Sequence, residues 1–345
     1  MRKEALRAGA LLLTLALLLP VAGCQGGADG PAQSSAAVQN AGPSMPERDA
    51  APQVLVPEAP GTETLGNDKV WIDVSNRGEG YITVRYDGDN DKVKLQITCG
   101  EGETYTYNLQ KDVPEVFPLT AGDGQYRIGI YENISGTKYS QVFSGEQAVV
   151  LDSEFGPFLY PNQYVDFDAD SQAVAKGAQL AEGAADELEV VGRIYDFVVG
   201  EIRYDYDKAD NPTSNYLPDI DETLQSRMGI CFDYAALMTA MLRTQRIPTK
   251  LVIGYVGELY HAWISVYIEG QGWINNIIYF DGEKWTRMDP TMASTGGGAQ
   301  EYVGDGKSYH ELYYLSLIHI FFISGISTYS LFLSRTMRRT RWDTC

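Results

Sequence analysis

The stretch GICFDYAALMTAML, residues 229–242, sets a cysteine immediately before a run of residues that form helices well. Apolar side chains recur at helical spacing between residues 237 and 242, so we expect this helix to pack one apolar face against a core. Gly229 breaks the preceding structure, and the helix is expected to begin at or near Cys231. A helix N-terminus lowers the pKa of a thiol through its dipole and offers backbone N–H groups to an oxyanion. The stretch predicts a reactive thiol at a helix start.

Two later segments carry a histidine and an aspartate at strand ends. The alternation from His261 to Ile268 predicts a strand that begins with the histidine. A second predicted strand, residues 285–291, holds Asp289 directly before a proline, and residues 280–283 signal a hairpin ahead of it. In a cysteine enzyme the thiolate attacks an amide carbonyl, the imidazole protonates the leaving amine, and a carboxylate orients the imidazole. The three residue types, in this order, match the layout of papain-like catalysis.

Three motifs in this order resemble the core motifs of the transglutaminase-like superfamily. They are residues 229–235, 261–263 and 288–291. The resemblance covers roughly residues 190–295 and implies an α+β fold with a papain-like transglutaminase core. The stretch between the last two motifs is longer than in the shortest members of the family, and residues 270–280 are predicted to form an enlarged hairpin there.

The resemblance implies a role for each matching residue. Cys231 matches the family nucleophile, His261 its base and Asp289 the acid that orients the base. Tyr204 and Trp263 are candidates for contacting the substrate or its oxyanion. Taken singly, the cysteine would more often be a buried structural residue and the histidine an ordinary strand residue. The order of all three favours catalysis.

The first residues have the features of an export signal. A positive start precedes an apolar run over residues 11–19, and small residues follow directly before Cys24. Residues 1–23 therefore resemble a bacterial lipoprotein signal peptide, with Cys24 lipidated at the extracytoplasmic face of the cell membrane. A plain signal peptide or a spanning helix is the alternative, although the run is short for a span. Residues 24–64, rich in Gly, Ala, Ser and Pro, are predicted to be a flexible linker.

Beyond the linker the sequence alternates with period two. Short runs rich in Val, Ile, Thr and Tyr, separated by Gly, Asn and Asp, predict an all-β antiparallel sandwich domain over residues 65–152. The pattern becomes helical from about Asp168, and we expect a transglutaminase-like domain over residues 160–314. Residues 315–345 turn apolar and then arginine-rich in an otherwise acidic chain, and we interpret this tail as a sequence artefact rather than as a spanning helix.

The composition limits the partners that the chain can have. It has 345 residues and a formal net charge of -19, which argues against nucleic acid because phosphate binding needs a basic surface. The four cysteines and three histidines have no paired spacing that would hold a metal, so neither a metal nor another cofactor is expected. The expected partners are a peptide or protein substrate and, through the lipid anchor, the membrane.

These observations favour a cell-surface cysteine enzyme that acts on peptide or side-chain amides through a thioester. The residues leave open whether water or an amine accepts the acyl group, and hydrolysis is favoured because water is always present. A second hypothesis keeps the fold without the chemistry, as a non-catalytic module that binds peptide or cell-wall polymer. A third makes the sandwich a carbohydrate binder. Fast alkylation of Cys231 would favour the first hypothesis over the second.

Overall fold

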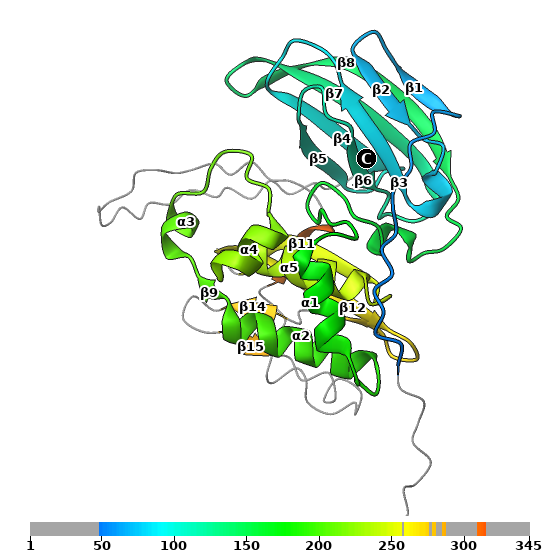
Figure 1. The fold of residues 1–345 in the computed structure, drawn as a ribbon. Helices are drawn as coiled ribbons and strands as arrows, with labels where there is room; N and C mark the ends of the chain where they lie inside the picture. Colours follow the sequence, from blue (N-terminus) through cyan, green and yellow to red (C-terminus); the bar gives the residue numbers. More distant parts are fainter. Residues whose placement is uncertain (1–47, 257–258, 276–277, 281–284, 288–308, 315–345) are drawn as a thin grey trace, which may run out of the picture. The chain divides into compact units, whose positions relative to one another are not determined.

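The computed structural model describes residues 48–256, 259–275, 278–280, 285–287 and 309–314 (Figure 1). Within them, an all-β region precedes a mixed region of helices and mainly antiparallel strands. This succession confirms the predicted fold class, an antiparallel sandwich followed by an α+β core. The site lies in the second region, and the first is described only as far as it supports that site.

The β region consists of two four-stranded antiparallel sheets. One sheet has the strand order β1-β2-β3-β6 and the other β5-β4-β7-β8. Ile72 and Val84 of the first sheet and Leu95 and Ile128 of the second are all 0% exposed, because each sheet turns one face toward a shared core. The strands are β1 Thr64–Asn67, β2 Val70–Asp73, β3 Tyr81–Tyr86, β4 Val93–Cys99, β5 Thr104–Leu109, β6 Glu115–Pro118, β7 Gly124–Ser135 and β8 Lys138–Val149.

Six of these strands coincide with the alternating runs of the sequence, whereas β1 and β6 do not. The sequences of these two strands, TLGN and EVFP, contain too few alternating apolar residues to stand out. Their strand structure comes from pairing, since β1 pairs with β2 and β6 pairs with β3. Strand preference depends on such neighbours more than on the segment itself.

A glutamine helps to fasten the segment that leaves the sandwich to it. It contains the 3-10 helix η2, Gly156–Phe158. The Gln163 side chain then donates hydrogen bonds to Asn108 O at 2.6 Å and to Glu115 Oε1 at 2.7 Å. Both acceptors belong to the sandwich, so the chain enters the second region from a fixed point.

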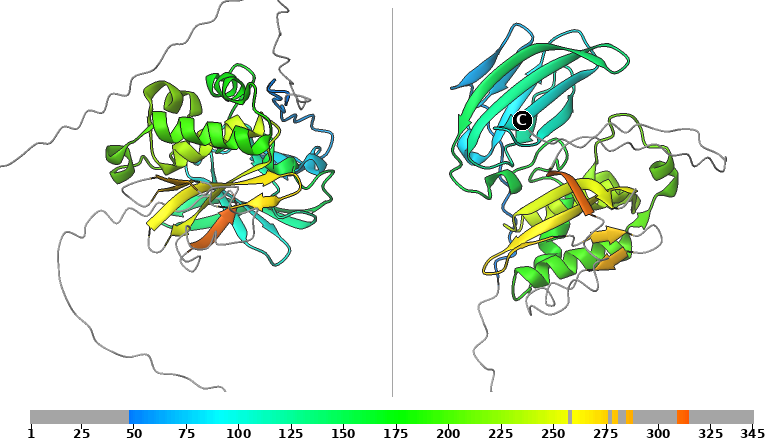
Figure 2. Two further views of the ribbon diagram at one scale, coloured as in Figure 1. Left: turned by 90° about the horizontal axis from the view of Figure 1, so that it is seen from below. Right: turned by 180° about the vertical axis from the view of Figure 1, so that it is seen from behind.

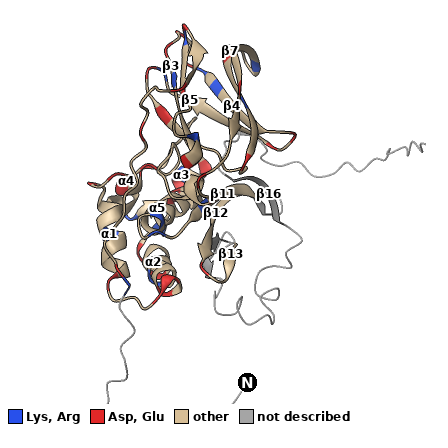
Figure 3. Ribbon diagram, turned by 90° about the vertical axis from the view of Figure 1, so that its right-hand side faces the viewer, with Lys and Arg blue, Asp and Glu red and all other residues tan. Residues whose placement is uncertain are grey.

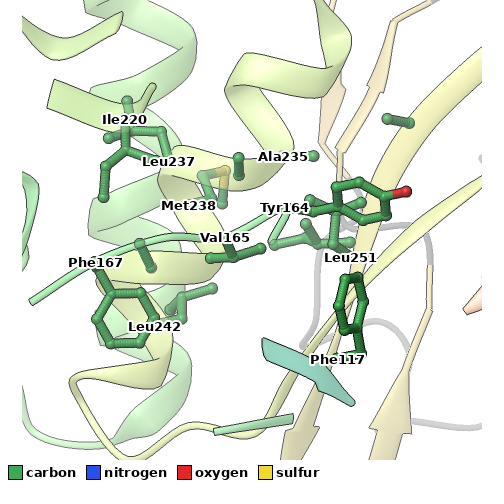
Figure 4. Close-up of a cluster of buried hydrophobic side chains, with 14 of the residues drawn as sticks. Phe117, Tyr164, Val165, Phe167, Ile220, Ala235, Leu237, Met238, Leu242 and Leu251 are labelled. Carbon is green, nitrogen blue, oxygen red and sulfur yellow. The ribbon is translucent and has the colours of Figure 1, made fainter. Parts of the chain in front are cut away.

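A buried aromatic residue connects the two regions. The ring of Tyr164, which is 1% exposed, lies 5.6 Å from the ring of Tyr107 in β5 and 5.6 Å from the ring of Phe232. Figure 4 shows Tyr164 in a cluster of buried side chains that also includes Phe117 of β6 and Leu251. The sandwich therefore shares hydrophobic core with the region that contains the predicted nucleophile.

Within residues 48–230, four α-helices precede the cysteine. The helical pattern that begins near residue 173 is split, because Gly183 has φ +67° and Asp186 starts a new helix by accepting a hydrogen bond from Glu189 N at 2.8 Å. The cap and the left-handed glycine end one helix and begin the next. The helices are α1 Gln172–Ala181, α2 Glu187–Glu201, α3 Tyr206–Asp210 and α4 Ile220–Ser226.

Helix α5, Cys231–Arg243, is the centre of the second region. Every residue from Asp233 to Arg243 is buried, which corrects the expectation of a single apolar stripe. The reason is that α1, α2 and α4 pack against α5 and so do the strands β11, Thr249–Val256, and β12, Leu259–Ile268. Figure 2 shows the helices together on one side of these strands.

The strands of this region form a four-stranded antiparallel sheet of order β13-β12-β11-β16. Gly254 of β11 lies opposite His261 of β12. Gly270 in the turn between β12 and β13, and Gly272 at the start of β13, have φ angles of +77° and +84°, which favour glycine. β14 pairs with β15, as the hairpin signal at residues 280–283 predicts. In place of the enlarged hairpin predicted over residues 270–280, β13 pairs with β12. The bounds are β13 Gly272–Ile274, β14 Ile278–Phe280, β15 Trp285–Arg287 and β16 Tyr309–Tyr314.

The described part of the predicted linker, residues 48–63, makes hydrogen bonds beyond the end of α5. Gln53 N donates to Thr244 O at 2.8 Å, and the Gln245 side chain donates to Ala50 O at 3.0 Å. This stretch therefore has fixed partners in the α+β region. Among the described residues, no helix is long and apolar enough to cross a membrane.

Candidate active site

Cys231 is the first residue of helix α5, as the sequence predicts. The preceding residue, Ile230, is extended, with φ -95° and ψ 177°, and its N–H donates to Asp233 Oδ2 at 2.8 Å. Gly229 is required just before this turn, because a Cβ there would lie 2.7 Å from the Asp233 Cβ. The helix start is thus fixed by a short backbone segment with no side chain at its tightest point.

Some of the surroundings of the Cys231 thiol raise its pKa and others lower it. Packing around the thiol raises the pKa to about 11, and the negative charge of Asp233 acts in the same sense. The backbone N–H groups of Ala262, Phe232 and Cys231 itself favour the thiolate and lower the pKa. Burial outweighs them, so the sequence expectation of a lowered pKa is wrong for the unliganded protein. The helix dipole favours a thiolate, but this stabilisation is smaller than the cost of removing water from around the sulfur.

His261 is the third residue of strand β12, which begins at Leu259 and not at the histidine as the sequence predicts. Its side chain is 2% exposed. Burial lowers the pKa of its imidazole to about 4, so the ring is neutral at neutral pH. The next residue, Ala262, is the one whose backbone N–H reaches the Cys231 thiol. The structure therefore brings the histidine-bearing end of β12 to the start of α5, although the two residues are 30 positions apart in the sequence.

Tyr204 lies on the other side of the nucleophile. It belongs to the short strand β9, Arg203–Tyr204, which pairs in parallel with β10, Met228–Gly229, just before the cysteine. The backbone N–H of Cys231 lies within hydrogen-bond reach of the Tyr204 hydroxyl, and burial raises the pKa of that phenol. The phenol therefore lies beside the first residue of α5.

Trp263 occupies a different position from Tyr204. Its indole is 2% exposed and stacks on His261, with the ring centroids 6.5 Å apart and the planes inclined by 18°. The indole therefore packs along the imidazole within the protein. Asp289 and Cys24 lie outside the described residues, and the described part of β15 ends two residues before Asp289, at Arg287.

Sequence reasoning missed a buried polar cluster around Asp233, two residues after Cys231. The Asp233 carboxylate is 0% exposed and pairs with Lys208 Nζ at 2.9 Å. It also accepts a hydrogen bond from the Tyr216 hydroxyl. An aspartate at the third position of a helix indicates capping, and this one does cap Ile230. Nothing in the sequence pattern connects it to a lysine 25 residues away and a tyrosine 17 residues away.

The family comparison agrees with the geometry. Residues 174–290 match the family model described as Transglutaminase-like superfamily. This range contains Cys231, His261 and Asp289, and it begins within α1. No curated protein matches the chain.

Several solved structures match the chain over part of its length. One is a proposed cysteine protease from Cytophaga hutchinsonii, 18% identical, with 62% of this chain and 67% of that chain covered and a TM-score of 0.30. Another is a TGase, 15% identical, with 52% and 49% covered and a TM-score of 0.30. A third is red sea bream transglutaminase, 15% identical, with 56% and 47% covered and a TM-score of 0.25. The chain spans about half the length of the last two.

Proposed function

Because residues 174–290 match the model of the transglutaminase-like superfamily, we propose that this protein is a cysteine enzyme whose nucleophile is Cys231. The observation that carries the proposal is the meeting of two distant segments. The thiol at the start of α5 lies within hydrogen-bond reach of the Ala262 N–H, one residue after His261. A thiol and an imidazole held at adjoining element ends are what acyl transfer needs.

In the proposed reaction, Cys231 Sγ attacks an amide carbonyl while its proton passes to His261. The negative charge on the carbonyl oxygen is met by backbone N–H groups at the helix start and by the Tyr204 hydroxyl. The C–N bond then breaks, and His261 returns the proton to the leaving amine. Asp289 is proposed to orient the imidazole. The acyl group remains on the sulfur as a thioester.

We propose that water more often than an amine completes the reaction, which makes the enzyme a protease or deamidase acting on peptides or proteins. Water attacks the thioester, His261 takes a proton from it, and the acid and the free thiol are released. If a primary amine attacks instead, the same thioester gives a new amide. The proposal also places the enzyme on the extracytoplasmic face of the membrane, anchored through a lipid on Cys24.

One observation favours a non-catalytic alternative, in which the fold binds peptide or cell-wall polymer. A thiol with a pKa of about 11 and an imidazole with a pKa of about 4 are both neutral at neutral pH. A resting thiolate–imidazolium pair is therefore disfavoured in the unliganded protein. Under the catalytic proposal, the proton moves only when a substrate carbonyl is in place. Under the alternative it never moves.

Hydroxylamine trapping tests the proposed function. The full chain is incubated with a peptide mixture rich in glutamine, and a thioester captured by hydroxylamine gives a hydroxamate that mass spectrometry identifies. We expect the hydroxamate with wild type and none with Cys231→Ser or His261→Ala. If no hydroxamate or acid forms with wild type, the binding alternative replaces the enzyme. Incorporation of a labelled primary amine without free acid would replace hydrolysis by transfer.

The membrane anchor has its own test. Intact mass of the mature protein should show a diacylglycerol on Cys24, and Cys24→Ala should move the protein from the membrane fraction to the soluble fraction. Cys99, a half-buried cysteine of the sandwich, supplies the matched control, because Cys99→Ala should leave the protein in the membrane fraction. Release of the Cys24→Ala protein without any lipid on wild type would contradict the anchor.

A further inference from the structure

Asp233 links the nucleophile to a loop that is separate in sequence. One carboxylate oxygen, Oδ2, accepts from Ile230 N at 2.8 Å and from Lys208 Nζ at 2.9 Å. The other, Oδ1, accepts from the Tyr216 hydroxyl. The first bond fixes the backbone directly before Cys231, and the other two hold the loop that contains α3. Figure 3 shows acidic and basic residues together around α3.

The same carboxylate places a negative charge near Cys231, which acts together with burial against a thiolate. Asp233 is two residues from Cys231 in the first turn of α5, and its side chain is 0% exposed. A carboxylate removed from water keeps its full effect on a neighbouring group, and a negative charge opposes the formation of a thiolate. The partner cation, Lys208, has a side chain that is 27% exposed and so lies toward water.

Other ionisable groups around the thiol do not supply a compensating charge among the described residues. Tyr204 on β9 and His261 on β12 are both neutral at neutral pH, from the directions of their pKa shifts. The adjoining strand β10 contains only Met228 and Gly229. From the α4 side, Asp219 and Glu222 act on Tyr216. Arg243 lies at the opposite end of α5.

We propose that Asp233 is a positioning residue that fastens the α3 loop to the nucleophile end of α5 and adds to burial in keeping Cys231 a neutral thiol in the resting protein. The proposal rests on the function proposed above, because the thiol it restrains is that nucleophile. A protonated thiol resists alkylation and oxidation, since the thiolate is the reactive form. Asp233 would thus protect the sulfur until a substrate is bound.

The test is the pH profile of Cys231 alkylation by iodoacetamide in the full chain, followed by mass spectrometry of the Cys231 and Cys99 peptides. Asp233→Asn removes the charge and keeps the size and an acceptor oxygen. Tyr216→Phe is the matched variant, because it removes one hydrogen bond from the same carboxylate and leaves the charge. We expect Asp233→Asn to speed alkylation of Cys231 at neutral pH by about tenfold, the effect of a thiol pKa lowered by about one unit.

In the same series Tyr216→Phe should keep the wild-type profile, and Cys99 should react alike in every variant. Amide turnover should fall in Asp233→Asn while thiol reactivity rises, because the loop is released as the charge is removed. A folded Asp233→Asn protein with the wild-type alkylation profile would overturn the proposal. Alkylation needs no substrate, so this comparison stands even where the wild type turns over no amide.

If Asp233→Asn does not fold, a measurement on wild type alone can still test the effect of the Asp233 charge on the Cys231 sulfur. Iodoacetate carries a negative charge that iodoacetamide lacks. If Asp233 dominates the field at the sulfur, the rate ratio of iodoacetate to iodoacetamide is lower at Cys231 than at Cys99 in the same chain. An equal or higher ratio at Cys231 would contradict the proposal.

Discussion

The two ends of helix α5 both bury an ionisable side chain, but they treat it differently. At the C-terminal end, Arg243 is 1% exposed and donates to Thr249 O at 2.9 and 3.1 Å and to Tyr160 O at 2.6 Å. At the N-terminal end, the Cys231 thiol is surrounded by backbone N–H groups that favour an ion which burial disfavours. At the C-terminal end, the buried Arg243 guanidinium makes fixed hydrogen bonds. At the N-terminal end, the Cys231 sulfur lies close to N–H groups that can stabilise its thiolate.

Helix α5 therefore contributes to stability at one end and to the proposed chemistry at the other. Arg243 joins the helix to β11 and to the segment that leaves the sandwich, so its hydrogen bonds hold three parts of the chain together. Removing such a residue should destabilise the fold without altering the thiol. Changes at Cys231, His261 or Tyr204 should alter reactivity while the fold persists. Each prediction below tests this division.

The largest effect is expected from replacement of the nucleophile. Cys231→Ala should lower amide turnover by about 10⁴-fold or more, because the covalent step is lost. Its free energy of unfolding should change by about 1 kcal/mol or less, since the side chain is small. Cys99→Ala is the matched control and should keep full turnover. Turnover assays and urea denaturation measure the two quantities, and full activity in Cys231→Ala would assign the chemistry elsewhere.

The opposite end of the helix should respond in the opposite way. Arg243→Met leaves the Thr249 and Tyr160 carbonyl groups without this donor and should lower the free energy of unfolding by about 3 kcal/mol or more. Turnover per folded molecule should stay within about threefold of wild type. Arg246→Met is a fitting control, because Arg246 is more exposed and donates to Ala51 O at the surface. A large loss of turnover at unchanged stability would show that the two ends are not separable.

The acid sensitivity of the fold should depend on His261. Its pKa is lowered from an ordinary value of 6.5 to about 4, so the folded state binds a proton less readily than the unfolded chain does. This contribution to stability is complete above about pH 6.5 and is lost as the pH falls toward 4, by about 3 kcal/mol in all. His261→Gln should flatten that part of the stability profile measured by urea denaturation. Parallel profiles for wild type and variant would contradict the burial of a neutral imidazole.

A smaller effect is expected from the hydroxyl beside the nucleophile. Tyr204→Phe should lower kcat/KM for an amide substrate by about tenfold, equal to about 1.4 kcal/mol, through loss of one donor to the oxyanion. The ring contacts with Tyr206 and Tyr234 remain, so the melting temperature should stay close to that of wild type. Tyr206→Phe changes an exposed hydroxyl of the same pair and should leave kcat/KM unchanged. Equal losses in both variants would remove Tyr204 from the oxyanion site.

Much of the architecture could be predicted because local patterns control it. The alternation of apolar and polar residues predicted six of the eight sandwich strands, and the glycine before Cys231 predicted the start of α5. The missed strands β1 and β6 owe their structure to pairing partners, and the break between α1 and α2 depends on a cap rather than on composition. The residues of the predicted triad were found through order and spacing, which indicate a family but contain no distances.

The sequence by itself determined where helix α5 begins, which residues alternate in β12, and that a thiol, an imidazole and a carboxylate follow one another in the order of a cysteine enzyme. These properties depend on neighbours within a few residues. Only the tertiary structure decided that α5 is buried all round, that Asp233 joins Lys208 and Tyr216, and that the thiol and the imidazole are both neutral at rest. Burial and electrostatic coupling depend on segments tens of residues apart meeting in one core, and no local pattern encodes how much water such a meeting excludes.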